Sequence, residues 1–204
     1  MNRLDVTTPR GRRRLPAIAV RASVPPTVPA RLLARVHARL HPWRPRLEAP
    51  RLTALVRRLD VQATPRGVVR LRLRTPGKRG RVTGGRHAVR ALAELREFLE
   101  GRRTLFSVPV DFSGLGAFQR RVLSSASRVA FGEVVSYAAL AASVGRPRAA
   151  RAVGNALAAN PVPIIVPCHR IVRSNGTWGH YGLGPALKTR LLGFECATVG
   201  RSRQ

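Results

Sequence analysis

The chain has 204 residues, enough for one ordinary domain or two small ones with modest cores. Its 38 basic and 9 acidic residues give a formal net charge of +29. Its two cysteines exclude a disulfide framework, and no apolar run approaches the roughly 20 residues that cross a bilayer. We therefore expect a cytoplasmic protein without a membrane segment, in which a thiol stays reduced and can act as a nucleophile.

The positive charge comes almost entirely from arginine, since Lys78 and Lys188 are the only lysines. A surface of this charge fits a polyanionic partner. Nucleic acid is the leading one, because arginine binds phosphates and can insert between bases. A GC-rich genome would also raise the arginine content, so the charge suggests DNA without establishing it.

Residues 1–57 carry 13 arginines and two acidic residues, a net charge of +11. One helix is predicted there, over residues 31–40, and its apolar face holds Leu33, Val36 and Leu40. The rest of the stretch is expected to be an extended, poorly ordered basic arm, because it is rich in proline and arginine and carries no catalytic constellation.

Residues 58–110 have the pattern of an abbreviated α/β domain. In residues 68–74 arginines alternate with apolar residues, which predicts a strand with one solvent-exposed face. The row Arg70, Arg72 and Arg74 either contacts DNA or is solvated, and solvation is favoured. After the breakers Thr75-Pro76-Gly77 and Gly84-Gly85, a helix that ends at Gly101 is expected to bury Val89, Leu92, Leu95, Phe98 and Leu99.

Residues 111–159 predict a helical hairpin. Ser113 can cap a helix with the apolar stripe Leu115, Phe118, Val122 and Val129. Ser136 can cap a short helix over residues 137–144 that Gly145 ends, and Pro147 stands where a second helix begins and runs to about Ala159. Two short helices joined by such a turn form a helix-turn-helix, whose second helix enters a DNA groove. That second helix combines the arginines 146, 148 and 151 with residues that are almost all small.

Residues 160–172 contain the residues that are candidates for catalysis. Two short apolar strands are predicted on either side of Pro167-Cys168-His169-Arg170. Most lone cysteines are buried and inert, but a histidine and an arginine beside Cys168 can favour its thiolate. A glycine-rich segment, residues 176–184, follows and can close over a pocket.

At this point the chain resembles the O6-alkylguanine-DNA alkyltransferases, or methylated-DNA–protein-cysteine methyltransferases. The resemblance is strong over residues 111–195 and weak over residues 58–110. The motifs that carry it stand in the expected order: Phe131-Gly132-Glu133-Val134-Val135-Ser136-Tyr137, Ala149-Ala150-Arg151-Ala152-Val153-Gly154, Asn160-Pro161, Ile165-Val166-Pro167-Cys168-His169-Arg170, Gly179-His180-Tyr181-Gly182 and Leu191-Leu192-Gly193-Phe194-Glu195.

The resemblance implies a catalytic role for four residues. Cys168 would accept the alkyl group, and His169 would take the thiol proton through a water molecule. Glu195 would orient the histidine and balance its charge, the third part of a nucleophile–base–orienter arrangement. Tyr137 would donate a proton to the guanine as it leaves.

The resemblance also implies how DNA binds. The helix-turn-helix would lie in the minor groove of double-stranded DNA that contains O6-alkylguanine. Arg151 would fill the place of the flipped nucleotide, with Arg148, Ala150 and Gly154 beside it. Support for the turn and the active site would come from Asn160, Pro163, Pro167, Arg170 and Tyr181.

These observations predict an α+β protein, with a small N-terminal sheet-and-helix domain before a mostly helical C-terminal domain that holds the DNA-binding helix-turn-helix. Residues 111–195 would form the alkyltransferase domain and residues 196–204 a tail. We expect a monomer that needs no cofactor, and the scattered histidines offer no metal site. The alternatives are a lesion-recognising DNA-binding protein without transfer activity and a cysteine hydrolase.

Overall fold

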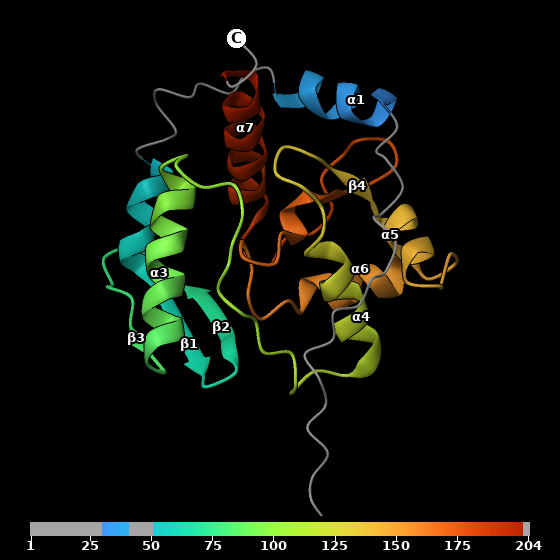
Figure 1. Cartoon of the computed structure of the whole chain (residues 1–204). Helices are drawn as coiled ribbons and strands as arrows, with labels where there is room; N and C mark the ends of the chain where they lie inside the picture. The colour runs from blue at the N-terminus through green and yellow to red at the C-terminus, as the bar shows by residue number, and fades with distance from the viewer. Residues whose placement is uncertain (1–29, 41–50, 202–204) are drawn as a thin grey trace, which may run out of the picture.

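The computed structural model describes residues 30–40 and 51–201 of the chain, and the remainder of the predicted basic arm lies outside these ranges. A small sheet with one helix lies beside a larger group of helices, and the long helix α7 (Pro185–Arg201) stands between them (Figure 1). The predicted α+β class is confirmed. One hydrophobic core extends from Leu52 to Phe194 through both parts. No helix in the described ranges is long and apolar enough to cross a membrane.

The sheet has three strands in the order β2-β1-β3. β1 (Leu59–Thr64) pairs antiparallel with β2 (Gly67–Leu73) and parallel with the two-residue strand β3 (Val82–Thr83). The predicted strand over residues 68–74 is confirmed, with Leu71 buried and Arg70 and Arg72 exposed on either side of it. Arg74 differs from the predicted row of solvated arginines, because it is only partly exposed and its Nη1 lies 3.6 Å from Oδ2 of Asp60.

Helix α3 (Arg86–Leu99) packs on this sheet (Figure 1). Leu95, Phe98 and Leu99 are buried as predicted. The predicted burial of Val89 is wrong, because Val89 is 63% exposed, whereas Ala88 and Ala91 are fully buried. The helix therefore presents its small residues to the sheet, which permits a close approach that a pattern of large apolar residues does not reveal.

The predicted boundary at residue 57 is also wrong. Residues 51–53 are helical, and a 3₁₀ helix η1 (Ala54–Arg58) follows and leads directly into β1. Leu52 is fully buried, and Leu55 and Val56 join it in the core. The neighbouring arginines gave this stretch the composition of the basic arm, yet its apolar residues have the spacing of a helical turn with one buried side.

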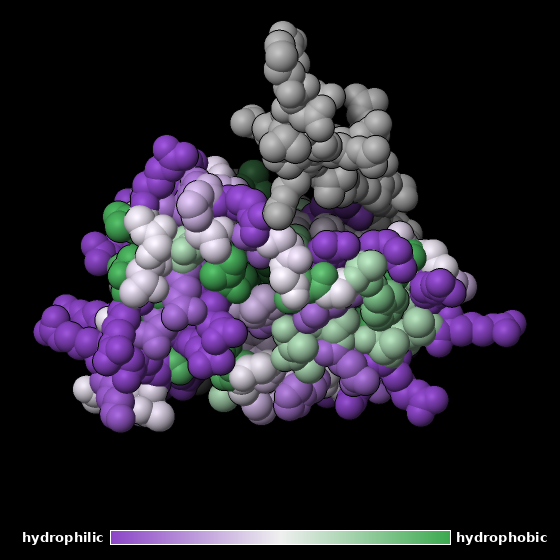
Figure 2. All heavy atoms as spheres, turned by 90° about the horizontal axis from the view of Figure 1, so that it is seen from below, coloured by the Kyte–Doolittle hydropathy of each residue, from purple (hydrophilic) through white to green (hydrophobic). Residues whose placement is uncertain are grey.

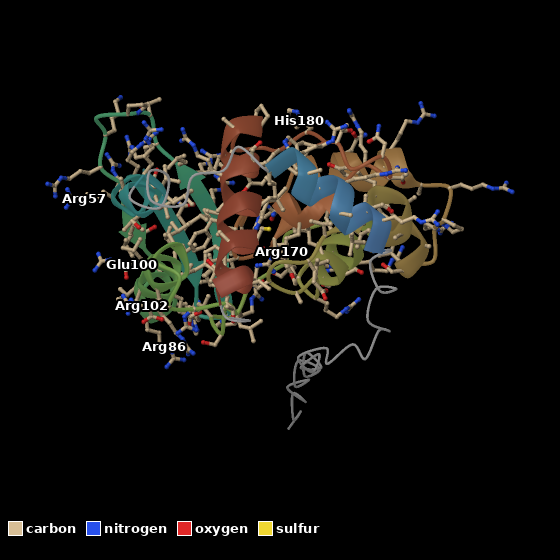
Figure 3. The ribbon with its side chains drawn as sticks, turned by 90° about the horizontal axis from the view of Figure 1, so that it is seen from above. Arg57, Arg86, Glu100, Arg102, Arg170 and His180 are labelled. Atoms are coloured by element: carbon tan, nitrogen blue, oxygen red, sulfur yellow. The ribbon has the colours of Figure 1, made fainter. Side chains whose placement is uncertain are left out.

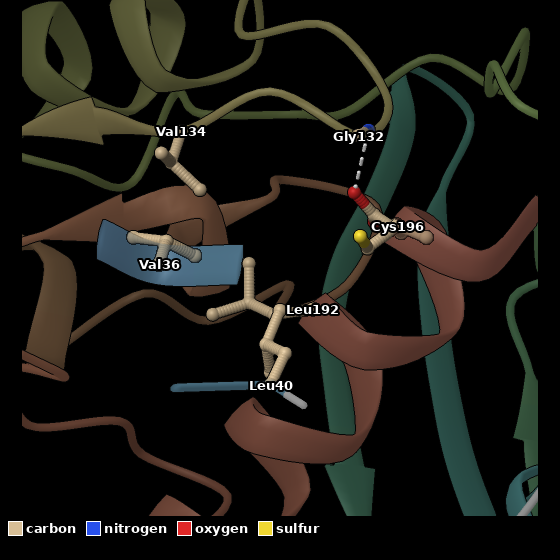
Figure 4. Close-up of a pocket in the computed structure, with 7 residues that line it drawn as sticks. Val36, Leu40, Gly132, Val134, Leu192 and Cys196 are labelled. Atoms are coloured by element: carbon tan, nitrogen blue, oxygen red, sulfur yellow. Dashed lines mark hydrogen bonds between the residues drawn. The ribbon is translucent and has the colours of Figure 1, made fainter. Parts of the chain in front are cut away.

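Helix α1 (Ala30–Leu40) is confirmed as a helix, and it contacts α7. Its buried side chains Leu32, Val36 and Leu40 form a second cluster with Val134, Val172 and Leu192. Figure 4 shows Val36 and Leu40 facing Val134 and Leu192 around a small cavity of about 10 Å³. Residues 30–40 are thus packed against the rest of the structure and are not part of an unstructured arm. Three apolar residues on one face of the helix contact an apolar surface.

Helix α4 (Ala117–Ala126) starts later than predicted, with Gly116 at its N-cap. Ser113 does not cap it, since its amide donates to Asp111 and its hydroxyl accepts from Arg66. Val129 lies beyond the end of the helix, although it is buried.

The predicted helical hairpin is present. Helix α5 (Tyr137–Ser143) is capped as expected, because the hydroxyl of Ser136 accepts a hydrogen bond of 3.0 Å from the amide of Ala139. A turn at Gly145, with a φ of 73°, leads towards α6 (Ala150–Ala158). The expected start of α6 at Pro147 is wrong, because a second turn, closed by the amide of Ala149 and the carbonyl of Arg146, occupies that position.

The strand predicted before Cys168 is wrong. Residues 161–167 form a tight turn, with an isolated bridge between Pro163 and Val166 and a positive φ of 75° at Ile164. The three prolines of this segment lack the amide hydrogen that a paired strand requires. The second strand is confirmed as β5 (Ile171–Val172), which pairs parallel with β4 (Val135–Ser136).

Helix α7 also corrects the predicted tail, since residues 196–201 continue it. Cys196 packs against the α1 cluster. A Cβ at Gly132 would stand only 2.6 Å from Cγ2 of Val199, so the side chain of Val199 packs closely against this glycine. Tertiary contacts therefore keep the last turns of this helix in place, although the sequence places Gly193 and Gly200 within it.

The packing of residues 51–57 predicts that a mutation at Leu52 destabilises the core, although the sequence alone places this residue in the arm. Leu52→Ala should lower the free energy of unfolding by about 2–5 kcal/mol, because it leaves a cavity in the main hydrophobic core. Urea unfolding measures this change. Leu105→Ala is the control, since Leu105 is 71% exposed, and it should stay within about 0.5 kcal/mol of the unmodified protein. Equal effects of the two changes would contradict this packing.

Candidate active site

Cys168 begins the short 3₁₀ helix η2 (Cys168–Arg170), directly after the proline-rich turn. The residue is 5% exposed. Its Sγ accepts a hydrogen bond of 3.0 Å from Nδ2 of Asn160, the residue that follows α6 and the C-cap Ala159. The thiol is therefore held between the end of the helical hairpin and the first residues of η2.

Asn160 fastens the whole turn as well as the thiol. Its Nδ2 also donates to the carbonyl oxygen of Val166 (3.1 Å), and its Oδ1 accepts from the amide of Val162 (3.0 Å). Pro163 and Pro167 are both buried inside this turn. These hydrogen bonds are those expected of a brace between α6 and the nucleophile, which is the position that the sequence assigns to Asn160.

Behind Cys168 lies a buried cluster of charged residues. Nε2 of His169 lies 2.8 Å from Oε1 of Glu195 on α7. Arg170 donates to both carboxylate oxygens, through Nε (2.9 Å to Oε2) and Nη2 (2.9 Å to Oε1), and its Nη1 donates to the carbonyl of Val129 (2.7 Å). The amide of Gly132 donates to Oε2 of Glu195 (2.9 Å; Figure 4). The cluster joins α7, η2 and the segment after α4, and Figure 3 labels Arg170 beside α7.

The ionisation of the cluster follows from its contacts. Burial alone would raise the pKa of Glu195, but the charges of Arg170 and His169 and their hydrogen bonds outweigh it and lower the pKa to about 2. Burial lowers the pKa of His169; Glu195 opposes this shift, whereas Arg170 and Lys188 add to it. At neutral pH the cluster therefore holds a carboxylate, a guanidinium and a neutral imidazole.

This ionisation also fixes the tautomer of His169. A carboxylate can only accept hydrogen bonds, so the imidazole proton must be on Nε2, which faces Glu195. Nδ1 then carries the free lone pair. That atom is buried and makes no hydrogen bond within the described part of the chain. His169 is thus prepared to accept a proton at Nδ1, which is the task of a general base.

The state of the thiol differs from the expectation. Burial raises the pKa of Cys168 to about 11, and the hydrogen bond from Asn160 and the charge of Lys188 offset this only in part. The neighbouring arginine does not favour a thiolate as predicted, because Arg170 is committed to Glu195 and Val129. Cys168 is therefore a protonated thiol at neutral pH, and it needs a base when it reacts.

Tyr137, the first residue of α5, lies close to two glycines. A Cβ at Gly179 would lie 2.0 Å from the Tyr137 hydroxyl oxygen, so no other residue fits there without a shift. The Tyr137 hydroxyl donates to the carbonyl of His180 at 3.5 Å. Burial raises the pKa of Tyr137, a negative charge on Cys168 would raise it further, and Arg173 partly opposes the shift. The phenol stays protonated at neutral pH and can donate.

Lys188 on α7 is a buried residue that sequence reasoning missed. Its Nζ donates to the carbonyl of Ile171 (2.5 Å) and lies 5.8 Å from the centre of the Tyr137 ring. Burial lowers its pKa to about 8, although a negative charge on Cys168 would oppose the shift. One signal was present: an amine can titrate when it is buried and a guanidinium cannot, and lysine is rare in this chain.

Tyr181 forms the remaining wall. It is buried, its ring meets that of His169 edge-on at 6.2 Å between centroids, and its hydroxyl makes no hydrogen bond within the described residues. His180, beside it, is exposed. The glycine-rich segment therefore directs Tyr181 inward and His180 outward.

The residues assigned to DNA lie on the outer side of the hairpin. Arg148 and Arg151 are exposed, and Ala150 and Gly154 are partly exposed. A Cβ at Gly154 would stand in ordinary contact with the Tyr137 ring, so this position also connects α6 with the site. Figure 2 shows a patch of apolar, pale green residues ringed by hydrophilic ones on the side where α4, α5 and α6 lie.

A cavity of about 330 Å³ reaches Cys168 from the surface. Pro163, Gly182 and Leu183 line it next to the cysteine, with the end of α6 on another side. Its volume is in the range of small-molecule pockets. Among the described residues, no group of three or more histidines, cysteines and acids lies close enough to hold a metal ion.

Comparisons with known proteins agree with this arrangement. A family model described as the DNA-binding domain of 6-O-methylguanine DNA methyltransferase matches residues 117–197. A methylated-DNA–protein-cysteine methyltransferase of Mycolicibacterium paratuberculosis is 38% identical over 120 residues, which cover 59% of this chain and 72% of that relative. The mouse protein of the same name is 54% identical over 87 residues, or 42% of this chain.

The solved structures agree as well. The crystal structure of Mycobacterium tuberculosis OGT in complex with DNA is 32% identical, with a TM-score of 0.61, and covers 69% of this chain and 87% of that one. The fold and the buried cysteine behind a helical hairpin thus place the protein among the DNA alkyltransferases. The chain belongs to the methylated-DNA–protein-cysteine methyltransferase family. It spans 41% of the mouse relative and 56% of the inducible one from Bacillus subtilis.

The buried cluster generates a prediction about stability. Glu195→Gln should lower the free energy of unfolding at pH 7 by about 3–5 kcal/mol, because it leaves the charge of Arg170 buried without its partner. The folded pKa of about 2 lies below the ordinary value of 4.5. The contribution of the carboxylate is therefore present above pH 4.5 and is lost as the pH falls towards 2.

Urea unfolding at pH 7 and at pH 3 measures this contribution. The difference between the unmodified protein and Glu195→Gln should narrow at the lower pH. The exposed Glu133 gives the control Glu133→Gln, which should change little at either pH. A difference that stays constant with pH would show that Glu195 is not held as a carboxylate.

Proposed function

We propose that this protein repairs double-stranded DNA by transferring the alkyl group from O6 of guanine to its own Cys168. The observation that carries the proposal is the set of contacts around that thiol. Asn160 donates a hydrogen bond to its sulfur, and the neighbouring neutral His169 is held by the ionised Glu195. Membership of the family and the cavity at Cys168 support it.

In the proposed reaction, Nδ1 of His169 takes the thiol proton, through a water molecule, as the alkylated base binds. The sulfur then attacks the alkyl carbon, the new S–C bond forms, and the C–O6 bond breaks with its electron pair remaining on guanine. Because Glu195 is already negative, it stabilises the imidazolium that forms beside it. The raised pKa of Cys168 means that this step needs the base, which explains why His169 lies behind the cysteine.

Tyr137 supplies the proton that the leaving guanine needs. Expulsion of a guanine anion into a dry pocket would be costly, and the phenol at the start of α5 is protonated and faces the glycine-rich segment. Lys188 lies near the Tyr137 ring and adds positive charge as the phenol loses its proton. When the proton on His169 returns to the Tyr137 phenolate through solvent, the sum of the reaction is one thiol and one alkylguanine converted to one thioether and one guanine, without a cofactor.

The hairpin supplies the contact with DNA. The exposed face of α6 presents Arg151 among small residues, including Ala152 and Ala158, which lets the helix approach the minor groove closely. A base must leave the stack before in-line attack at its O6 substituent is possible. We propose that Arg151 fills the space it leaves, that Arg148 contacts the backbone, and that the protein acts as a cytoplasmic monomer.

The proposed function predicts a single turnover. A thioether on Cys168 has no good leaving group, so each molecule should accept one methyl group from a duplex with O6-methylguanine and then stop. Intact-mass analysis should show a gain of one CH₂ unit, and peptide mapping should place it on Cys168. Methyl on Cys196, or turnover beyond one equivalent, would contradict the mechanism.

Cys168→Ser tests the nucleophile itself. This variant should still bind the duplex and transfer nothing, because a serine hydroxyl is a far poorer nucleophile towards saturated carbon. Duplex binding by an unmodified protein that transfers nothing would favour the lesion-recognition alternative. Hydrolysis of an ester by the unmodified protein, without a change in its mass, would favour the cysteine hydrolase.

Arg151→Ala tests base flipping. It should slow repair of duplex DNA by about ten- to hundredfold, because unstacking costs a few kcal/mol, and should slow transfer from the free modified base far less. Single-turnover rates on the two substrates measure this difference. Arg148→Ala is the control and should cause only a small, salt-sensitive loss. Equal slowing on both substrates would mean that Arg151 supports the pocket.

A further inference from the structure

The cavity at Cys168 has a wall that the proposed reaction does not use. This wall is part of strand β2 in the sheet of the N-terminal part. The cavity is lined there by Arg70, Leu71 and Arg72. The methyl group alone gives no reason for two arginines to border the cavity that holds the nucleophile.

The position of this wall follows from the sheet. β2 is an edge strand, and the amide of Leu71 donates to the carbonyl of Pro161 (2.8 Å), in the same turn that Asn160 braces. Successive side chains of a strand point to opposite faces, so Arg70 and Arg72 share one face. This backbone hydrogen bond thus holds the part of β2 that carries both arginines beside the turn that leads to Cys168.

The two arginines differ from their neighbours in their partners. Arg66 binds Asp111 and Arg74 lies near Asp60. Within the described ranges, no ion pair involves Arg70 or Arg72, and both are exposed. Asp60 lies opposite Arg72 in the strand pair, but its carboxylate contacts Arg74 and the amide of Arg81. Arg70 and Arg72 are therefore two exposed positive charges at the border of a cavity of about 330 Å³. A cavity of this size accepts a base with a substituent larger than methyl.

We propose that Arg70 and Arg72 select O6-alkyl groups that end in a carboxylate, such as the carboxymethyl group. This inference rests on the proposed function. The sulfur of Cys168 would attack the CH₂ carbon, the C–O6 bond would break, and guanine would leave with the electron pair and a proton from Tyr137. The carboxylate takes no part in these bonds. It accepts hydrogen bonds from the guanidinium groups, which are stronger when both partners are charged.

The experiment compares single-turnover rates on two duplexes of the same sequence. One contains O6-carboxymethylguanine and the other O6-(carbamoylmethyl)guanine, which has the same shape but a neutral amide end. The unmodified protein should transfer the carboxymethyl group about tenfold faster, the effect of one charge-assisted hydrogen bond. In the double variant Arg70→Gln and Arg72→Gln the ratio of the two rates should fall to about one.

The matched control is the double variant Arg79→Gln and Arg86→Gln. It removes the same two charges from exposed residues that do not line the cavity, and Figure 3 shows Arg86 at the edge of the sheet-and-helix side. It should keep the ratio of the unmodified protein. Equal rates on the two duplexes, or a ratio that survives in the Arg70 and Arg72 variant, would overturn the inference. A ratio that survives in this variant would mean that other residues recognise the carboxylate.

A third duplex, with O6-methylguanine, separates this inference from the proposed function. Methyl transfer together with equal rates for the two larger groups would remove the inference and leave the function standing. Failure to transfer any of the three groups would overturn the proposed function and the inference with it. Intact-mass analysis distinguishes the products, because the carboxymethyl group adds C₂H₂O₂ and the methyl group adds CH₂.

Discussion

The carboxylate of Glu195 is the contact on which the rest of the site depends. A charge that is fully buried must be paired and hydrogen-bonded, and this one receives donors from η2 and from the backbone at Gly132. These partners come from segments far apart in the sequence. Their convergence fixes α7 against η2, and with it the direction of the His169 imidazole and the position of Cys168 next to it.

The same cluster explains why the cysteine is protected until it is used. Its buried thiol has a pKa of about 11, and the nearby arginine is occupied by Glu195, so a thiolate does not exist in advance. In the proposed function this property has a clear benefit. A protein that reacts once would be wasted by any free alkylating agent, and a thiol that needs both its base and a bound guanine avoids that loss.

The two parts of the molecule meet at the turn between α6 and Cys168. From one side Asn160 holds this turn, and from the other side β2 does so through Leu71 and Pro161. The N-terminal sheet consequently borders the cavity at Cys168 and is not a separate unit. This contact places Arg70 and Arg72 beside the cavity, whereas the sequence alone indicates a solvated strand face.

Local patterns in the sequence were sufficient for several features. The alternation in residues 68–74 predicted β2, Ser136 and Gly145 marked the limits of α5, and the tetrad at Cys168 placed a cysteine and a histidine next to each other directly after the proline-rich turn. These features depend on neighbours within a few residues. Asn160 and Glu195 were indicated by the family resemblance and not by a local pattern, since Glu195 lies 26 residues from His169 along the chain.

Other features were decided only by tertiary contacts. Leu52 and Val36 are buried because distant surfaces cover them, whereas the composition around them is that of an arm. Val89 is exposed because the small residues of α3 face the sheet. The protonation of Cys168, the burial of Lys188 and the place of Arg70 and Arg72 beside the cavity all depend on which segments lie next to them. Burial, charge pairing and the limits of a cavity are sums over contacts between distant residues, and for this reason the folded chain determines them.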